Sequence, residues 1–295
     1  NKIKKGDTQK PPHILKGCIY MFKMKKLAAV AMATVLSLGA VSCGADVTSP
    51  DAHSVAAIKK KGSITIATES QYAPFCFKDD KGNIIGLEPS FMQAIADDLG
   101  VKLDIQDMAF DSVIPSVQSG ACDIGMAGLT PTAKRKESVD MTDFYNHGGQ
   151  AMLVLTKDLD TYASADTLKG KKIAAQKASL QQTIGEEQFK DSTLSLLPKV
   201  PQCVEELKMG NVDAVLVDDV TAKQYADMSG GVISVSKVEV KVDESELGSA
   251  AAVMKGNTDL NDYLNGLIKK LWESGDLDKW YISAKDTASK LGLDV

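Results

Sequence analysis

The sequence has little with which to build a metal site or a disulfide framework. Only three histidines are present, and none of the five cysteines has the spacing of a metal-binding pair. Beyond Cys43 an odd number of cysteines remains, which cannot all pair within one chain, and the apolar contexts of Cys76 and Cys122 favour buried free thiols. We expect no metal and no other cofactor. The histidines are His13, His53 and His147, and the third of these cysteines is Cys203.

A run of apolar residues long enough for a membrane helix is also missing at the amino-terminal end. The uncharged run over residues 27–41 falls short of the roughly 20 residues that a spanning helix needs. Lysines precede this run and small residues follow it, which is typical of a secretory signal. The end of the run, 40–43, resembles a lipoprotein signal, in which Cys43 is acylated and becomes the mature amino terminus. An uncleaved membrane anchor is the alternative.

The residues around this signal set the expected start of the folded protein. The chain begins with Asn1, and Met21 or Met24 lies just ahead of the signal, so residues 1–20 are interpreted as translated upstream sequence or an extension. Residues 1–42 would then comprise that extension and the signal peptide. Residues 43–62 would be a lipid-anchored tether and a short helix that Gly62 closes.

Basic residues are scarce once this signal is set aside. Without residues 1–42, 26 lysines and arginines face 38 aspartates and glutamates, a net charge near −12. A surface of that sign repels phosphate backbones, so it argues against nucleic-acid binding and favours a soluble domain.

Strand-like and helix-like stretches alternate along the remaining residues. A strand over 64–68 and a hairpin over 75–85 precede a periodic helix over 87–99 that ends at Gly100, and a strand over 101–105 follows. Such alternation predicts an α/β protein in which helices flank a mainly parallel sheet. About 250 residues suit two lobes of ordinary size.

The segment from Gly120 to Glu137 predicts an anion-binding corner. A short strand over 124–127 stops at Gly128, the chain turns at Thr130, and a helix begins at Thr132. The first amides of a helix lack intrahelical partners and the helix dipole is positive there. Arg135 follows one turn later and can hold a carboxylate with two parallel bonds. An ordinary surface arginine is the alternative.

A similar unit carries the opposite charge ninety residues later. Gly120-x-x-Asp123 has a counterpart in Gly210-x-x-Asp213, and the strand over 214–217 ends in Asp218 before a helical stretch. Opposite charges at the carboxyl ends of strands in two units suggest a two-lobed protein that grips a zwitterion. Separately, residues 179–182 fit a capping box in which the side chain at 182 reaches back to the cap, giving one more helix start with free amides.

These motifs, in this order and at this spacing, resemble the extracytoplasmic solute-binding proteins of amino-acid ABC importers. The resemblance implies a two-lobed periplasmic-binding-protein fold with a two-strand hinge: residues 63–147 and 246–295 form the first lobe, and residues 148–245 form the second. The segments that carry it are 72–77, 81–87, 110–120, 128–135, 210–219, 254–257 and 275–280.

The resemblance also implies which residues bind the α-carboxylate of an amino acid. Arg135 would hold it with help from Thr130, and Ser179 and the Leu180 amide would reach it from the second lobe. Ala178 stands where the family usually has a glycine, so the approach of that loop differs from the family pattern.

The remaining implied contacts concern the α-ammonium and the side chain of the ligand. Asp218 would bind the ammonium, with acceptors from Gly128 and Thr130. Tyr72 and Phe110 would sandwich the side chain. Glu69 would reach the far end of the ligand and favour a polar or basic group such as arginine, lysine, histidine or glutamine. The alternative is that Glu69 caps its loop and faces solvent.

The same resemblance implies the partners. The expected function is capture of an amino acid by a monomeric lipoprotein on the outer face of the plasma membrane or in the periplasm, and delivery to a permease with its ATPase. No enzyme activity is expected. The alternatives are a dehydratase of small carboxylates on the same fold, for which Glu69 is the one candidate acid or base, and a ligand sensor for a membrane receptor.

Overall fold

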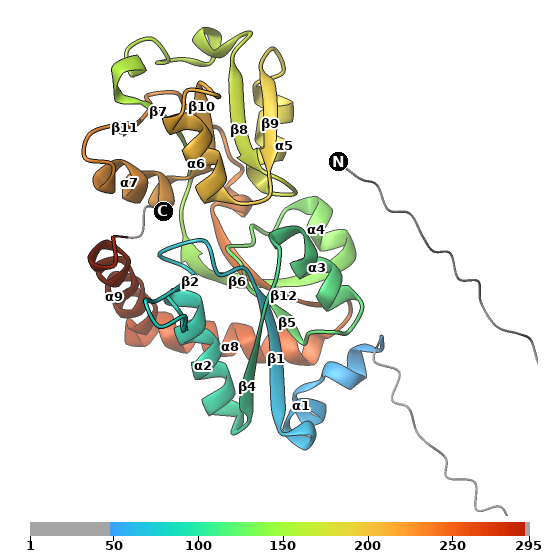
Figure 1. Ribbon diagram of the computed structural model, residues 1–295. Helices are drawn as coiled ribbons and strands as arrows, with labels where there is room; N and C mark the ends of the chain where they lie inside the picture. Colours follow the sequence, from blue (N-terminus) through green and yellow to red (C-terminus); the bar gives the residue numbers. More distant parts are fainter. Residues whose placement is uncertain (1–47, 293–295) are drawn as a thin grey trace, which may run out of the picture. The chain divides into compact units, whose positions relative to one another are not determined.

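The computed structural model describes residues 48–292, which are organised around two five-stranded sheets (Figure 1). The expected signal peptide, the extension ahead of it and the acylated Cys43 lie outside these residues. The first sheet has the order β4-β1-β5-β12-β6, with β1 (Ser63–Thr68), β4 (Lys102–Asp107), β5 (Ile124–Gly125), β6 (Val139–His147) and β12 (Gly248–Met254). The second has the order β11-β7-β10-β8-β9, with β7 (Gln150–Leu155), β8 (Lys172–Gln176), β9 (Thr193–Leu197), β10 (Ala214–Asp218) and β11 (Ile233–Val235).

Each sheet is buried on both faces because its strands alternate between two apolar cores. In β12, Ala251 and Val253 point into one core while Ala252 and Met254 point into the other. Helices α2 (Leu87–Leu99), α8 (Thr258–Ser274) and α9 (Asp276–Lys290) cover one face of the first sheet, and α3 (Phe110–Gln118) covers the other. Around the second sheet, α6 (Val200–Lys208) and α7 (Asp219–Met228) lie against one face and α5 (Leu180–Gln188) against the other.

The α/β class is confirmed, and the parallel pairing holds for half of each sheet. Strand β1 pairs in parallel with β4 and β5, and β8 with β9 and β10. Strand β12 runs antiparallel to both of its neighbours, and so does β7. The reason is that the chain crosses between the sheets twice. Strand β7 enters its sheet from the first one and β12 returns from the second, so each starts at the edge where the neighbouring parallel strands end.

The chain crosses between the sheets in two adjacent segments. Gly148 and Gly149 join β6 to β7, and a short turn over Glu244–Glu246 leads into β12. Strands β6 and β12 pair with His147 opposite Gly248, and the Gly148 N–H donates to a carbonyl in the returning segment at 3.3 Å. The two crossings therefore lie side by side, as expected of a two-strand hinge.

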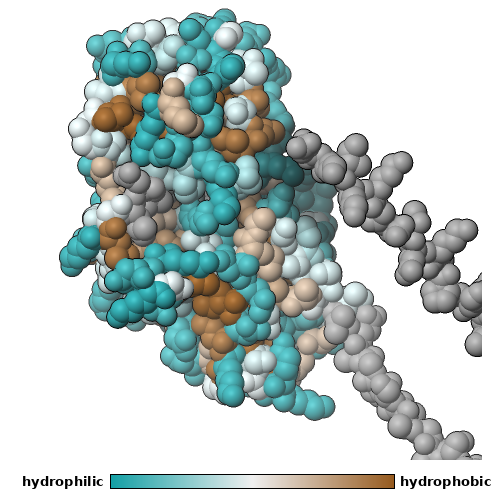
Figure 2. Space-filling view, in the orientation of Figure 1, coloured by the Kyte–Doolittle hydropathy of each residue, from teal (hydrophilic) through white to brown (hydrophobic). Residues whose placement is uncertain are grey.

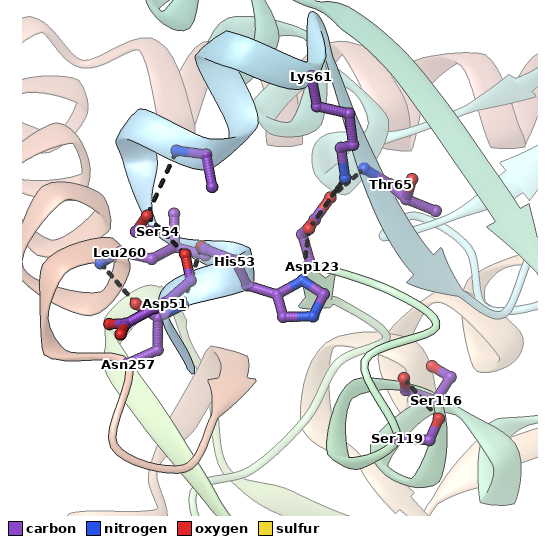
Figure 3. A network of polar contacts seen from close by, with 11 residues as sticks. Asp51, His53, Ser54, Lys61, Thr65, Ser116, Ser119, Asp123, Asn257 and Leu260 are labelled. Carbon is purple, nitrogen blue, oxygen red and sulfur yellow. Dashed lines mark hydrogen bonds and ion pairs between the residues drawn. The ribbon is translucent and has the colours of Figure 1, made fainter. Parts of the chain in front are cut away.

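The segment that precedes β1 is tied to the first sheet through Asp123 (Figure 3). One oxygen of Asp123 lies 2.7 Å from Nδ1 of His53, and the other accepts from Lys61 Nζ and from the Thr65 N–H, each at 2.8 Å. The short helix that Gly62 closes is α1 (Val55–Lys61), as predicted. A separate 3₁₀ turn, Pro50–His53, precedes it, because the extended Ser54 between them caps α1 by accepting from its backbone.

The two Gly-x-x-Asp motifs occupy equivalent places in the two sheets. Asp123 precedes β5, its N–H donates to the Thr65 carbonyl at 2.8 Å, and its carboxylate accepts from the Thr65 N–H at 2.8 Å. Asp213 precedes β10 and makes the same two bonds to Lys172, both at 2.8 Å. Each aspartate thus joins the start of one strand to its parallel neighbour.

Several sequence expectations concern the remaining elements. The hairpin forms between β2 (Phe77–Lys78) and β3 (Ile84–Ile85), and Cys76 and Cys122 are buried free thiols, as predicted; Cys203 is a third. Over residues 48–292, no helix is both long enough and apolar enough to span a membrane. Within the same range, no group of three potential metal ligands comes together.

Candidate functional site

The carboxyl ends of β1, β5, β8 and β10 and the hinge surround two cavities. A small one of about 20 Å³ is lined by Tyr72, Gly128, Thr130 and Asp218 together with the glycines of the hinge. A large one of about 1060 Å³ is lined by the other predicted carboxylate-binding residues and their neighbours. Glu69 lines neither of these two cavities. The predicted residues in the large cavity are Phe110, Arg135, Ser179 and Leu180.

Arg135 is held in place by the strand–turn–helix unit that the sequence predicted. Thr132 caps α4 (Ala133–Ser138), and the guanidinium folds back so that Nη1 donates to the Thr130 carbonyl at 2.8 Å. Nη2 donates to the Ala178 carbonyl of the second lobe at 3.2 Å, and Cζ lies 5.5 Å from the centre of the Phe110 ring.

The guanidinium of Arg135 has no ion-pair partner among residues 48–292. Its two protein acceptors are neutral carbonyls, and Glu246, the carboxylate whose charge acts on it, forms no ion pair with it in the described part of the chain. Burial lowers the pKa of Arg135 to about 10, which leaves the group charged at neutral pH. A partly buried charge without a counter-ion is costly, so this place favours a small carboxylate.

The loop before α5 differs in one detail from the predicted capping box. Ser179 caps α5 by accepting from the Gln182 N–H at 3.2 Å, as expected. The Gln182 side chain accepts from the N–H of Ala178 at 2.8 Å, not from that of the cap residue. The reason is that Ala178 has a φ of 62°, a left-handed conformation that turns its amide toward Gln182. The family departure at Ala178 is therefore a strained alanine in a position that suits glycine.

Asp218 lies at the end of β10 and faces the first lobe. It caps α7 by accepting from the Thr221 N–H at 2.9 Å, and its second oxygen accepts from the hydroxyl of Tyr72. Burial raises the pKa of the Asp218 carboxyl above its ordinary value, and the Tyr72 hydroxyl opposes this rise by stabilising the anion. This bond joins the two lobes at the small cavity.

Gly128 and Tyr72 fit together closely, so a side chain at position 128 would be strained and would press on the Tyr72 ring. Gly128 has a φ of +61°, and a Cβ built on it would lie 3.0 Å from Cε1 of Tyr72. The ring of Tyr72 stacks on Phe75 with centroids 5.4 Å apart. Tyr72 and Phe110 line different cavities, and Phe110 lies against the guanidinium of Arg135. The predicted sandwich of a ligand side chain between these rings stays a prediction.

Glu69 is buried between the lobes with one oxygen unsatisfied. It follows β1 directly, it is 4% exposed, and its Oε2 accepts from Nε2 of Gln176 at 3.2 Å. Oε1 has no hydrogen-bond partner among residues 48–292. Burial raises the pKa of Glu69 to about 7, against the bond from Gln176, which lowers it. The alternative in which Glu69 faces solvent does not hold in this structure.

Gln176 lies beside Glu69, and the sequence reasoning did not name it among the candidate site residues. It is the last residue of β8, it is 5% exposed, and Nε2 donates to the Pro198 carbonyl at 3.0 Å as well as to Glu69. The available signal was its place at the carboxyl end of a strand, three residues before the helix cap Ser179. Together with Glu69 it makes a polar pair at which a donor-rich group can be bound.

Comparison with known proteins shows what the chain is similar to. Residues 64–284 match the family described as bacterial extracellular solute-binding proteins, family 3. The arginine-binding extracellular protein ArtP of Bacillus subtilis (strain 168) is 30% identical over 275 residues, which cover 89% of this chain and 100% of ArtP.

Solved structures of similar proteins share the fold. An amino acid ABC transporter substrate-binding protein from Streptococcus pneumoniae, bound to L-arginine, has a TM-score of 0.75 and 34% identity, covering 79% of this chain and 97% of its own. The ancestral amino acid-binding protein AncCDT-1, a precursor of cyclohexadienyl dehydratase, has a TM-score of 0.72 and 28% identity, covering 78% and 98%.

Proposed function

Because the chain belongs to the bacterial extracellular solute-binding proteins of family 3, we propose that it captures a cationic amino acid, arginine above all, for an ABC transporter. The observation that carries this proposal is the distribution of charge between the lobes. Arg135 has no carboxylate within ion-pair distance among the described residues, while Asp218 lines the small cavity and Glu69 is buried beside Gln176 at the end of β1. One cation and two anions complement a ligand with one carboxylate and two cationic groups.

The α-carboxylate and α-ammonium of the ligand would be bound by opposite lobes. Arg135, on the first lobe, would hold the carboxylate with Thr130, and Ser179 and the Leu180 amide would approach it from the second. Asp218, on the second lobe, would take the ammonium in place of the Tyr72 hydroxyl. Because each lobe pairs one charge of the zwitterion, the ligand favours the closed arrangement of the lobes over an open one.

The side chain of the ligand would end at Glu69. Its unsatisfied Oε1 is an acceptor that a guanidinium or ammonium satisfies, and Gln176 holds its other oxygen at 3.2 Å. Two relatives support arginine in particular: the arginine-binding protein ArtP, at 30% identity, and the pneumococcal protein bound to L-arginine, at 34%.

Entry of such a ligand requires the lobes to separate. The small cavity, about 20 Å³, offers room for about one water molecule, whereas pockets for drug-sized ligands measure several hundred Å³. The two adjacent crossings at 147–149 and 244–248 provide the hinge for that motion, with glycines at 148, 149 and 248.

Delivery would take place at a membrane, with the protein tethered by a lipid on Cys43. The periplasm or the outer face of the plasma membrane is the proposed location, and the permease and its ATPase are the proposed partners. The face drawn in Figure 2 is mainly hydrophilic. Exposed large hydrophobic residues are spread over different elements, which supports a monomer: Leu196, Met209, Val232, Val235 and Ile282.

Titration calorimetry with the purified chain tests the ligand assignment. We expect arginine to bind at least as tightly as lysine, histidine and glutamine, and far more tightly than glutamate. Asp218→Asn should weaken arginine binding strongly, whereas Asp227→Asn, which changes an exposed aspartate of α7, should leave it near wild type. Tight binding of glutamate or of apolar amino acids alone would overturn the assignment of a cationic ligand.

A dehydratase is the second candidate, and one observation favours it. The pKa of Glu69 at about 7 is that of a general acid or base, and AncCDT-1 is the precursor of a dehydratase. Proton NMR of small cyclic and amino acids incubated with the protein discriminates the two functions. New resonances that disappear with Glu69→Gln would support the enzyme, whereas unchanged spectra over hours with bound arginine would support transport.

A further inference from the structure

Glu88 is a buried carboxyl group behind the predicted ligand site. It lies in the first turn of α2, it is 0% exposed, and it was not among the predicted site residues. Its Oε1 accepts from the Gly128 N–H at 2.6 Å and from the hydroxyl of Tyr145. Its Oε2 has no hydrogen-bond partner within residues 48–292.

We propose that Glu88 is a positioning residue for the ligand's α-ammonium: it fixes the Gly128 backbone, and it ties that loop to the hinge strand through Tyr145. The assignment rests on the proposed function, since it concerns the same site. It adds a residue that does not itself touch the ligand.

The geometry at Gly128 leaves little freedom for the loop. Gly128 has a left-handed φ of +61°, and a Cβ built there would lie 3.0 Å from Tyr72, whose hydroxyl reaches Asp218. A shift of the Gly128 backbone toward the cleft would press on that ring and displace the hydroxyl. The Gly128 N–H donates to Glu88, which is buried and does not line the small cavity, and this bond opposes such a shift.

The second bond of Glu88 reaches the strand that leaves the first lobe. Tyr145 lies in β6 and is 0% exposed, and its ring packs on Phe91 with centroids 5.6 Å apart. Asn146 and Gly148, one and three residues further along the chain, line the small cavity. Glu88 therefore joins α2, the Gly128 loop and the last part of β6 at one oxygen atom.

An acceptor is what this position requires. Without one, the Gly128 N–H and the Tyr145 hydroxyl would both be buried donors lacking partners, which is costly for each group. A glutamine retains an oxygen at the place of Oε1, and it tests whether the acceptor suffices. Methionine has a similar length and no such acceptor.

Binding measurements on three variants test the assignment, with L-arginine and its analogue lacking the α-amino group, 5-guanidinopentanoate, as probes. Glu88→Met should weaken L-arginine binding by about tenfold, the equivalent of one lost partner of a buried group, and change binding of the analogue much less. Glu88→Gln should restore L-arginine affinity to near wild type. Tyr145→Phe, which removes the tie to β6 and leaves the Gly128 bond intact, should also weaken L-arginine binding, by less than Glu88→Met does.

The readout that a merely structural role would not move is the ratio of the two affinities. Equal weakening of both probes by Glu88→Met, or no weakening at all, would overturn the assignment. If Glu88→Met does not fold, the Gly128 amide proton reports instead: a strong bond to a carboxylate predicts a downfield shift in the wild type that moves upfield in Glu88→Gln. An amide unchanged in that variant would also overturn it.

Failure of the proposed function would look different. It would appear in the wild type, as no binding of L-arginine or of any other amino acid, and the amide readout would still decide the role of Glu88. Failure of the Glu88 assignment would appear only between variants of a protein that binds L-arginine normally.

Discussion

Gln176 donates a side-chain N–H to Glu69 across the two lobes, at 3.2 Å, and so joins the end of β8 to the residue that follows β1. The pair is buried on both sides, and Glu69 keeps one oxygen without a donor among the described residues. This relationship makes Glu69 both a cost to the folded protein when ionised and an acceptor for a cationic ligand. The two consequences are measurable separately.

The burial of Glu69 predicts a pH-dependent stability. Its pKa in the folded protein, about 7, exceeds the ordinary value of 4.5, so the folded state holds the proton more tightly. The resulting stabilisation is fully present below pH 4.5 and is lost as the pH rises toward 7. Glu69→Gln, which cannot ionise, should therefore gain in free energy of unfolding relative to the wild type, by about 3 kcal/mol at pH 8. Urea unfolding at pH 4 and pH 8 measures this gain, and an equal difference at both values would contradict it.

Arginine binding should release protons from the same group. A guanidinium beside Glu69 favours its ionised form, so a carboxyl that is half protonated near pH 7 gives up its proton on binding. The affinity for arginine should fall as the pH drops from 8 to 6. Calorimetry at pH 7 in buffers of different ionisation enthalpy measures the release, and Glu69→Gln serves as the control. Identical enthalpies in both buffers for the wild type would show that Glu69 does not face the cation.

Arg135 is expected to supply much of the binding free energy. Arg135→Ala removes the one cation proposed for the α-carboxylate and leaves that carboxylate unpaired in the closed cleft. Losing one partner of a buried charge pair costs about 2 to 5 kcal/mol, so the Kd for arginine should rise at least about thirtyfold. Lys60→Ala removes an exposed charge from α1, where it lines neither cavity, and is the matched control. Calorimetry that finds an unchanged Kd for arginine in Arg135→Ala would remove Arg135 from the site.

Ala178 predicts a gain in stability from a glycine. Its φ of 62° is costly for an L-residue with a Cβ by about 1–2 kcal/mol, and glycine has no such cost. Part of this gain is offset by the greater freedom of glycine in the unfolded chain, so we expect Ala178→Gly to stabilise by a few tenths to about 1 kcal/mol. Ala175→Gly, in the extended and buried part of β8, should destabilise instead. Calorimetric melting of both variants decides, and a lower Tm for Ala178→Gly would refute the strain argument.

Local signals in the sequence were sufficient for much of the fold and part of the site. Thr132 and Ser179 cap the helices predicted from them because a cap depends on residues three positions apart. The left-handed glycine at 100 ends α2 for the same local reason. The α/β class follows from the same alternation of local patterns.

The parts that sequence reasoning missed depend on partners far along the chain. In the sequence, Glu88 is a charged residue in the first turn of an amphipathic helix, and its partners Gly128 and Tyr145 lie 40 and 57 residues away. Gln176 meets Glu69 at a separation of 107 residues. The antiparallel pairings of β7 and β12 likewise arise from the double crossing, which no single stretch of sequence encodes.

The equivalent bonds of Asp123 and Asp213 show how such a protein can change its ligand without losing its fold. Both aspartates lie at the starts of their strands, so they hold neighbouring strands in register at the edges remote from Arg135 and Asp218. Substitutions at the carboxyl ends of the strands do not change these two hydrogen-bonded pairs. The molecule is therefore modular along the direction of its strands: the amino-terminal ends hold the sheets together, and residues at the carboxyl ends can be changed by evolution or by design.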